Sequence, residues 1–239
     1  MRNTTAIMRR ELLSLFCSPV AYIVIFGFLL ITGILVWVTQ SFEPGKPATL
    51  RNVFQWTPFV LTVILPAIAM RSISEEYRSG TIESVATAPV SDFEFVLGKY
   101  LAVFFFYLIM LLGTVAYLLL MMYFGNPDVG ASVSAYIGLI MLGMFFSAFG
   151  VFASSLTNNQ IVAWMIGAVP LLLLTTLAYW VVSSTSGIAR EIAQQVNFMG
   201  RFENFARGSV SLEGLAFFLA ASLFFVFLAV KVVESRRWR

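Results

Sequence analysis

Long apolar stretches alternate with short polar segments along this chain of 239 residues. Six stretches are long and apolar enough to cross a bilayer of about 30 Å as helices. Their predicted limits are residues 20–38, 53–70, 100–124, 133–154, 161–182 and 215–233. The pattern therefore predicts an all-α membrane protein, with one transmembrane domain of six helices over residues 1–239.

Composition supports the same class of protein. Hydrophobic residues make up 59% of the chain and charged residues 11%, which is far from the composition of soluble domains. The formal net charge of +3 is too small to indicate a nucleic-acid partner, and the basic residues lie near the ends of the apolar stretches. We therefore expect the lipid bilayer, and no nucleic acid, as the surroundings of this chain.

Several kinds of chemistry lack the residues they need. The chain has no histidine and a single cysteine, and no predicted span carries an ionisable residue before Lys231. Intramembrane proteases and proton-coupled transporters normally use such residues within the bilayer. We therefore expect no catalytic, cofactor-binding or metal-binding residue. A scaffold that docks a cytoplasmic partner without transport stays open as an alternative, and an ion-coupled transporter is less well supported.

The distribution of lysine and arginine predicts the orientation. With the N-terminus inside, ten of the 15 basic residues fall on the cytoplasmic side. The positive-inside rule then places both termini in the cytoplasm. The segment between the second and third spans faces the cytoplasm as well.

Two segments outside the spans have an amphipathic pattern. Thr4–Phe16 has apolar residues on one helical face, which is typical of a helix that lies in the membrane interface before the first span. The external segment Ser184–Gly214 has apolar residues at helical spacing, namely Ile188, Ile192, Val196, Phe198, Phe202 and Phe205. This second pattern predicts a re-entrant or interfacial helix before the sixth span.

Between the second and third spans lies the densest group of charges, Arg71–Lys99. Ser72 and Glu75 have the spacing of a capping box, and Gly80 is a typical residue for a helix end. A second short helix is predicted over Thr81–Thr87, before Pro89. This segment is therefore expected to fold as short helices rather than as an open loop.

The strongest local signal is the helix start at Ser91. Ser91 and Glu94 form an S-x-x-E capping box, and Val90 and Phe95 occupy the positions of a hydrophobic staple. We expect a helix that begins here and continues through Lys99 into the third span. Such a continuous helix is stiff enough to carry a displacement from the cytoplasm into the bilayer.

Small residues recur every fourth or third position in the predicted fourth span. They are Gly143, Ser147, Gly150 and Ser154. Small residues at this spacing allow two helices to approach closely. The partner helix is either in a second subunit, which makes a dimer seam, or elsewhere in the same chain.

The charged segment resembles one particular family. The pattern E-x-x-x-G-T-I-E, then P-V-S and G-K before a span, is similar to permeases of ABC-2 type exporters. The residues that carry this resemblance are Glu76, Gly80, Thr81, Ile82, Glu83, Pro89, Val90, Ser91, Gly98 and Lys99. Residues 202–212, FENFARGSVSL, and the basic tail 234–239 resemble the branch of gliding-motility and copper-enzyme-maturation permeases.

The resemblance implies a role for the charged segment. In such permeases the cytoplasmic segment, here residues 71–91, holds coupling helices that dock on a separate ATP-binding subunit. The residues of this chain expected at that contact are Glu75, Glu76, Arg78, Gly80, Thr81 and Glu83.

The resemblance also implies the assembly. The chain would work with two ATP-binding subunits and a second permease, identical or related, in a bacterial cytoplasmic (inner) membrane. External accessory proteins are a further expected partner. No G-x-x-x-x-G-K-S/T motif occurs in the chain, so ATP and Mg²⁺ are expected on the partner subunit. The transported substrate is not indicated.

Overall fold

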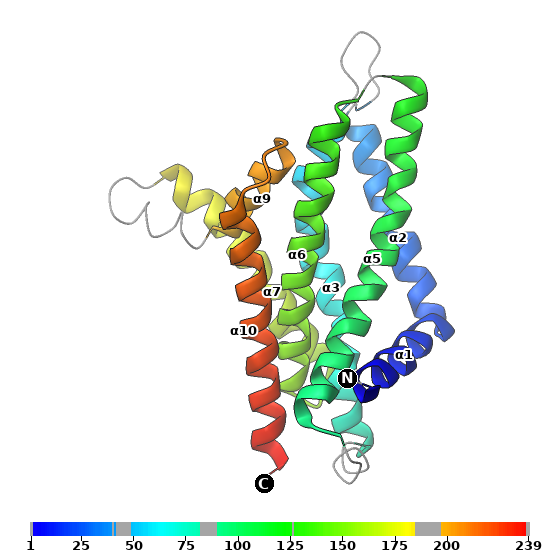
Figure 1. Ribbon diagram of the computed structural model, residues 1–239, viewed down its shortest axis with the longest axis vertical. Helices are drawn as coiled ribbons and strands as arrows, with labels where there is room; N and C mark the ends of the chain where they lie inside the picture. The colour runs from blue at the N-terminus through cyan, green and yellow to red at the C-terminus, as the bar shows by residue number, and fades with distance from the viewer. Residues whose placement is uncertain are drawn as a thin grey trace.

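The computed structural model describes residues 2–39, 41, 49–81, 90–125, 127–184 and 197–237. All regular elements within these residues are helices, as the apolar pattern predicted (Figure 1). They are α1 Arg2–Cys17, α2 Pro19–Val38, α3 Arg51–Ser79, α5 Asp92–Phe124, α6 Val129–Ser155, α7 Gln160–Ser184, α9 Phe198–Ala206 and α10 Leu212–Arg237.

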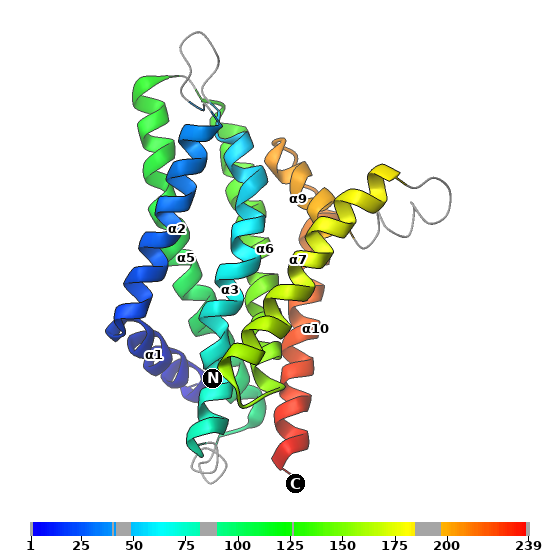
Figure 2. The ribbon, with the colours of Figure 1, turned by 180° about the vertical axis from the view of Figure 1, so that it is seen from behind.

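Five helices are long and apolar enough to cross a membrane, namely α2, α3, α5, α6 and α10. The sixth predicted span lies in α7, of which the part Gln160–Thr176, within the described residues, is an apolar helix shorter than those five. Pro170 lies inside α7, and the second half of this helix leads away from the bundle (Figure 2). These five helices therefore support a multi-pass membrane protein, and the sixth membrane span stays a prediction.

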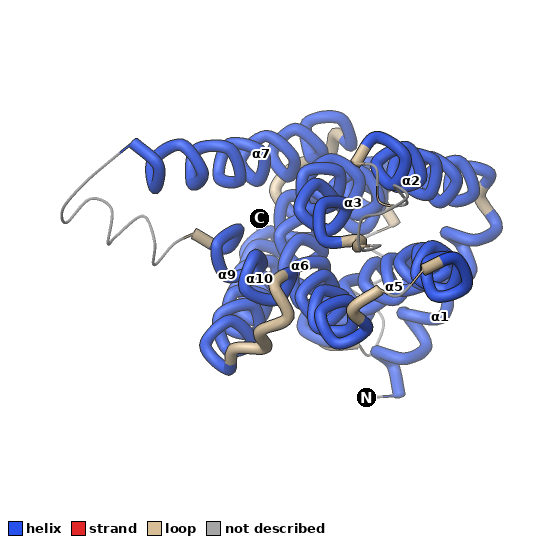
Figure 3. The backbone as a smooth tube through the Cα atoms, turned by 90° about the horizontal axis from the view of Figure 1, so that it is seen from above, coloured by secondary structure: helices blue, strands red, loops and turns tan. Residues whose placement is uncertain are grey.

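The two most buried spans, α3 and α6, form the centre of the bundle. Seen from above, α1, α2 and α5 lie to one side of this pair, and α9 and α10 lie to the other (Figure 3). The outer face of α2 is apolar and exposed, for example at Ile23 and Phe26, as expected for a helix that faces lipid. The chain thus buries its core around two helices and turns apolar side chains outward as well.

Both termini and the end of α3 lie at the same end of the bundle (Figure 1). We call the region around the end of α3, Ser72–Gly80, and the start of α5, Ser91–Lys99, the foot. The N-terminal helix α1 packs against α5 near this foot. The orientation of the foot toward the cytoplasm stays a prediction.

One predicted helix start in the foot is wrong. Ser72 does not cap a new helix, because α3 runs without interruption from Arg51 to Ser79. The Ser72 hydroxyl donates instead to the Ala69 carbonyl one turn earlier, a bond that serine makes inside helices. Burial of the neighbouring Ile73 in the core favours continuation of the helix through the predicted boundary.

Two other predicted signals in the foot are confirmed. Gly80 ends α3 in the left-handed conformation with φ of +71°, which glycine adopts without steric strain. Ser91 caps α5, and the reciprocal bonds of the capping box with Glu94 are both present. The short helix predicted over Thr81–Thr87 falls mostly on residues 82–89, which lie outside the described residues.

The predicted external segment is described only in part. Ile188, Ile192 and Val196 lie outside the described residues, whereas the second half contains α9. The rings of Phe198, Phe202 and Phe205 are buried. They pack against α6 and α10, so the apolar face of α9 is turned toward the protein.

Candidate functional site

The foot is a pair of helix ends whose geometry is set by local bonds. The Glu94 amide donates to the Ser91 hydroxyl over 3.2 Å, and the Ser91 amide donates to the Glu94 carboxylate over 3.3 Å. The hydrogen bond from the Ser91 amide, with a contribution from the Asn3 side chain, holds the pKa of the half-buried Glu94 below its usual value. The first turn of α5 is therefore fixed before the helix reaches its apolar part.

A buried ionic network joins the foot to α1. The side chain of Lys99 is only 1% exposed, and its Nζ lies 2.8 Å from Glu76 Oε1 and 3.0 Å from Glu11 Oε1. The same ammonium donates to the Ser72 carbonyl. Arg10 reaches Glu76 from the outside, over 3.2 Å. We call these side chains, from α1, α3 and α5, the foot network.

Burial makes the foot network a strong constraint. A charge removed from water loses several kilocalories per mole of hydration, and only close partners offset this loss. Lys99 has two carboxylates and one carbonyl as partners, which satisfies all three ammonium protons. Separation of α1, α3 or α5 at this point would leave a buried charge without its partner.

Sequence reasoning did not find the foot network. Glu76 was predicted as a contact with a partner subunit, and Lys99 carried only the family resemblance. Glu11 and Arg10 lay within the predicted interface helix Thr4–Phe16, with no role assigned. One available signal was the position of Lys99, which stands on the same helical face as the apolar Phe95, Val103 and Phe106. A lone cation on such a face requires a buried acidic partner.

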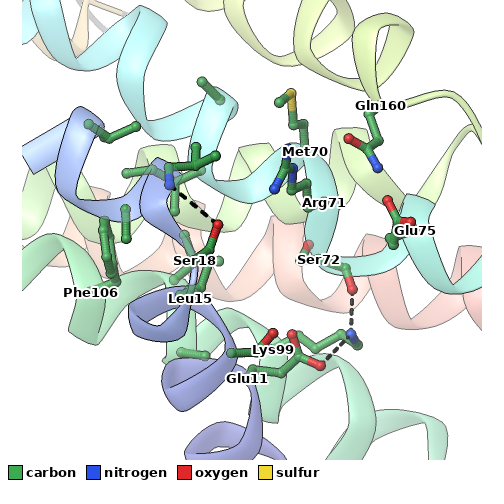
Figure 4. A pocket seen from close by; sticks show the side chains of 18 of the residues that line it. Glu11, Leu15, Ser18, Met70, Arg71, Ser72, Glu75, Lys99, Phe106 and Gln160 are labelled. Carbon is green, nitrogen blue, oxygen red and sulfur yellow. Dashed lines mark hydrogen bonds and ion pairs between the residues drawn. The ribbon is translucent and has the colours of Figure 1, made fainter.

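A cavity of about 540 Å³ lies beside the foot network, among α1, α2, α3 and α5 (Figure 4). Glu75 and Glu76 both line it, as do Arg71 and Lys99. Figure 4 shows Phe106 at one end of this cavity and Glu75 at the other. Three of the residues predicted for a partner contact, Glu75, Glu76 and Arg78, thus border this cavity.

The structure separates the residues predicted for the ATP-binding subunit into two groups. Glu76 is 8% exposed, and its partners are Arg10 and Lys99 within the chain. Glu75, Arg78, Gly80 and Thr81 are exposed, and Glu83 lies outside the described residues. Arg78 also borders a groove of about 830 Å³ formed with residues 156–161 and Arg236.

Arg236 brings the end of α10 to the same surface. Its guanidinium donates to Asn158 over 2.8 Å and to the Leu156 carbonyl, and it lies 4.6 Å from the centre of the Tyr77 ring. The α6–α7 turn, the end of α10 and the end of α3 therefore form one continuous polar surface.

The small residues of α6 lie in contacts within the chain. A Cβ on Gly143 would meet the Tyr107 ring at 2.0 Å, and one on Gly150 would meet the Ala69 Cβ at 2.7 Å. Ser147 is fully buried. Ser154 Oγ accepts from the amides of Ile73 and Ser74, over 3.1 and 3.0 Å. Close packing of α6 against α3 and α5 therefore accounts for the small side chains at these positions.

Comparison with protein families gives a match over most of the chain. The sequence profile of the ABC-2 family transporter protein matches residues 39–199, which include α3, α5, α6 and α7. A comparison with curated proteins found no match. The matched region contains both sides of the foot and the buried pair α3 and α6, and the chain belongs to the ABC-2 family of transporter proteins.

Proposed function

We propose that this membrane transporter component is the permease subunit of an ATP-driven exporter in a bacterial inner membrane. It would supply the transmembrane pathway or the element that transmits movement. ATP and Mg²⁺ would bind to a separate subunit, present in two copies, and a second permease, identical or related, would complete the assembly. External accessory proteins would be further partners.

The observation that carries this proposal is the construction of the foot. An exposed helix end at Gly80 and a firmly capped helix start at Ser91 stand side by side, and both continue into spans. A push on this pair from the cytoplasm moves two stiff helices, α3 and α5. A scaffold that only docks a partner has no need for such a rigid connection to the bilayer.

The contact with the ATP-binding subunit is proposed for the outermost residues of the foot. These are Arg78, Gly80, Thr81 and Glu83. The groove between Arg78 and Arg236 continues the same surface and contains no acidic side chain among its described lining residues. Glu75 and Glu76, which the sequence assigned to this contact, border the cavity and not the groove, whereas Arg78 borders both, so we propose that the two glutamates act behind the contact rather than in it.

Co-purification tests the proposal. The tagged chain is expressed in its own host and purified in mild detergent, and bound chains are identified by mass spectrometry. A partner with a Walker A motif, and MgATP hydrolysis by the complex, are expected. Arg78→Glu and Glu83→Arg should each reduce the recovered partner at least fivefold, because they reverse charges on the proposed contact.

Matched controls are available at the other end of the molecule. Arg51 lies at the start of α3 and Glu213 lies at the start of α10, both away from the foot. The control variants are Arg51→Glu and Glu213→Arg. Both should retain the partner. A complex without any Walker A protein would leave the scaffold as the better function. Equal loss in the control variants would contradict the assignment of the contact to the foot.

A further inference from the structure

The cavity beside the foot network changes from charged to apolar along its length. On α3 the lining begins with Glu75 and Arg71 and continues to Ile68 and Ala67, one turn deeper. On α5 it begins with Lys99 and continues to the apolar residues Ala102, Val103 and Phe106. On α1 and α2 it begins with Glu11, Ser14 and Ser18 and continues to Val20, Ala21 and Val24.

The lining of all three walls therefore changes from charged to apolar in the same direction. The charged end lies at the foot, and the apolar end points toward the middle of the spans. An apolar ligand would leave the charged end unmatched, and a small ion would leave the apolar end empty. The shape of this gradient fits an amphiphile whose headgroup lies at the foot and whose hydrocarbon part extends into the bilayer.

Three charged side chains on the cavity wall, Arg71, Glu75 and Arg78, have no partner among the described residues. Arg71 and Glu75 stand one turn apart on α3, a spacing at which an ion pair is common. Within the part of the chain that the structure describes, none of these three side chains makes a hydrogen bond or an ion pair. Arg78 also borders the groove with Arg236. The wall thus offers two free cations, Arg71 and Arg78, and one free carboxylate, Glu75, all within about two turns of α3.

A fourth charged side chain on the wall, Glu76, lacks a hydrogen-bond donor at one of its oxygens. Glu76 Oε2 is buried and accepts no hydrogen bond from any described residue, whereas Glu76 Oε1 is shared by Lys99 and Arg10. An unsatisfied carboxylate oxygen at such a depth is unfavourable by several times the thermal energy. A ligand with an N–H donor at this end of the cavity would supply the hydrogen bond that Glu76 Oε2 lacks.

We infer that the cavity binds one membrane phospholipid whose headgroup carries both a phosphate and a primary ammonium, as phosphatidylethanolamine does. The phosphate pairs with Arg71, and the ammonium lies between Glu75 and Glu76. The cavity volume of about 540 Å³ holds the headgroup and the first part of the acyl chains. The rest of the chains follows the exposed apolar face of α2.

The choice among headgroups follows from charge and hydrogen bonding. An anionic phosphatidylglycerol would satisfy Arg71 and be repelled by Glu75. A phosphatidylcholine would present a quaternary ammonium, which has no N–H to donate to the carboxylates. Of the three headgroups, ethanolamine is the one that can pair with Arg71 and donate an N–H to Glu75 at the same time.

Native mass spectrometry of the purified chain tests this site. The protein, in mild detergent, is mixed with equal amounts of phosphatidylethanolamine, phosphatidylglycerol and phosphatidylcholine. One phosphatidylethanolamine per chain is expected, at least tenfold above either of the other lipids. Equal binding of the three, or a preference for phosphatidylglycerol, would overturn the assignment.

Variants locate the lipid. Arg71→Gln and Glu75→Gln should each reduce bound phosphatidylethanolamine at least fivefold. Ala67→Leu leaves every charge in place and narrows the apolar end, and it should reduce binding similarly. Arg51→Gln, an exposed arginine at the far end of the same helix, is the matched control and should bind as the wild type does. Full binding by Arg71→Gln and Glu75→Gln would overturn the site.

Soluble phosphoethanolamine separates the headgroup from the lipid. At millimolar concentration it should fail to displace the bound lipid, because it lacks the acyl chains that occupy the apolar end. Displacement at the same concentration as the intact lipid would overturn the lipid assignment. None of these measurements requires an ATP-binding subunit, so their failure would leave the proposed function untouched.

Discussion

Two short amphipathic helices, α1 and α9, pack against the same bundle toward its opposite ends, and different forces hold them (Figure 1). The contact of α1 combines apolar packing, such as Phe16 against Phe106, with buried charges, because Glu11 meets the buried Lys99 and Arg10 meets Glu76. The contact of α9 is built on rings, because its three phenylalanines are buried beside α6 and α10.

The charges of α9 are arranged differently from those of α1. Arg201 pairs with Glu213 over 2.6 Å, but the carboxylate is 81% exposed and lies at the rim of the contact. Because the carboxylate stays in water, such a pair contributes less to stability than one whose two charges are both buried. An aromatic anchor of this kind holds a helix in place whatever happens to nearby charges.

The ionic anchor of α1 has another property. A buried ion pair that is pulled apart leaves its charges without water and without partners. When α3 or α5 moves at the foot, α1 therefore has to move with it. The comparison teaches that α9 is packed as a fixed part of the bundle, whereas α1 is tied to the element that is proposed to move.

The largest expected effect comes from removal of the buried cation. Lys99→Met leaves Glu11 and Glu76 without their shared partner, so we expect a loss of about 3–5 kcal/mol in the free energy of unfolding. Denaturant titration of the purified protein in micelles measures it. In the double variant Lys99→Met with Glu76→Gln, the second substitution should restore part of the lost stability. The buried carboxylate of Glu76 is then replaced by a neutral amide.

The control for Lys99 is a lysine of the same chain that is paired at the surface. Lys231 is 55% exposed and forms an ion pair with Glu234 over 2.7 Å. Lys231→Met should change the free energy of unfolding by less than about 1 kcal/mol. Equal effects of the two substitutions would show that burial adds nothing to the ion pairs of Lys99, and the ionic anchor of α1 would lose its basis.

The corresponding test for α9 removes one ring. Phe202 is fully buried, and Phe202→Ala creates a cavity beneath α9, so we expect a loss of about 3–5 kcal/mol. Neutralisation of a nearby charge should not restore it. Phe224→Ala on the outer face of α10, where the side chain is 55% exposed, serves as the control and should stay within about 0.5 kcal/mol. An equal loss in both variants would contradict the ring anchor.

The sequence was sufficient for those parts of the two regions that depend on local signals. Gly80 and Ser91 were predicted as a helix end and a helix start, and both predictions are confirmed, because capping involves residues within one turn. The apolar spacing of Phe198, Phe202 and Phe205 indicated a helix with one apolar face, and α9 has that face.

The sequence was not sufficient where distant segments meet. Ser72 has the local signal of a cap, but the burial of Ile73 carries α3 through it. The ion pair between Glu11 and Lys99 joins residues 88 positions apart, and no local pattern identifies such a partner. The proposed contact with an ATP-binding subunit depends on a second chain, so the sequence of this one supplies only its exposed residues.

A smaller loss of stability is expected where α9 and α1 each pack closely against a glycine of the bundle, and this allows a direct comparison of the two helices. A Cβ on Gly138 would lie 2.6 Å from Phe205 Cβ on α9, and one on Gly98 would lie 2.9 Å from Ile7 Cβ on α1. Gly138→Ala and Gly98→Ala should each cost about 1–3 kcal/mol through overpacking, with the greater loss at Gly138. Denaturant titration of the protein in micelles measures both losses.

Gly27 is the control for these two glycines. It lies within α2, and a Cβ at this position would meet no atom within 4 Å. Gly27→Ala should therefore stabilise the protein by roughly 0.5–1 kcal/mol, the difference in helix propensity between the two residues. A loss of stability at Gly27 similar to that at Gly98 would show that close approach is not the cause.

The smallest expected effect is at the outer edge of the foot network. The Arg10 side chain is 66% exposed and lies 3.2 Å from Glu76 and 3.3 Å from Glu11. Arg10→Gln should lower the free energy of unfolding by less than about 1 kcal/mol, and the difference should shrink as salt is added, because exposed charges are screened. The effect of Lys99→Met should depend much less on salt, since its partners are buried. A loss at Arg10 as large as that at Lys99, and equally insensitive to salt, would mean that α1 is held from its surface rather than from its buried side. In that case α1 could detach from the foot without uncovering a buried charge, and it would no longer be obliged to follow α3 and α5.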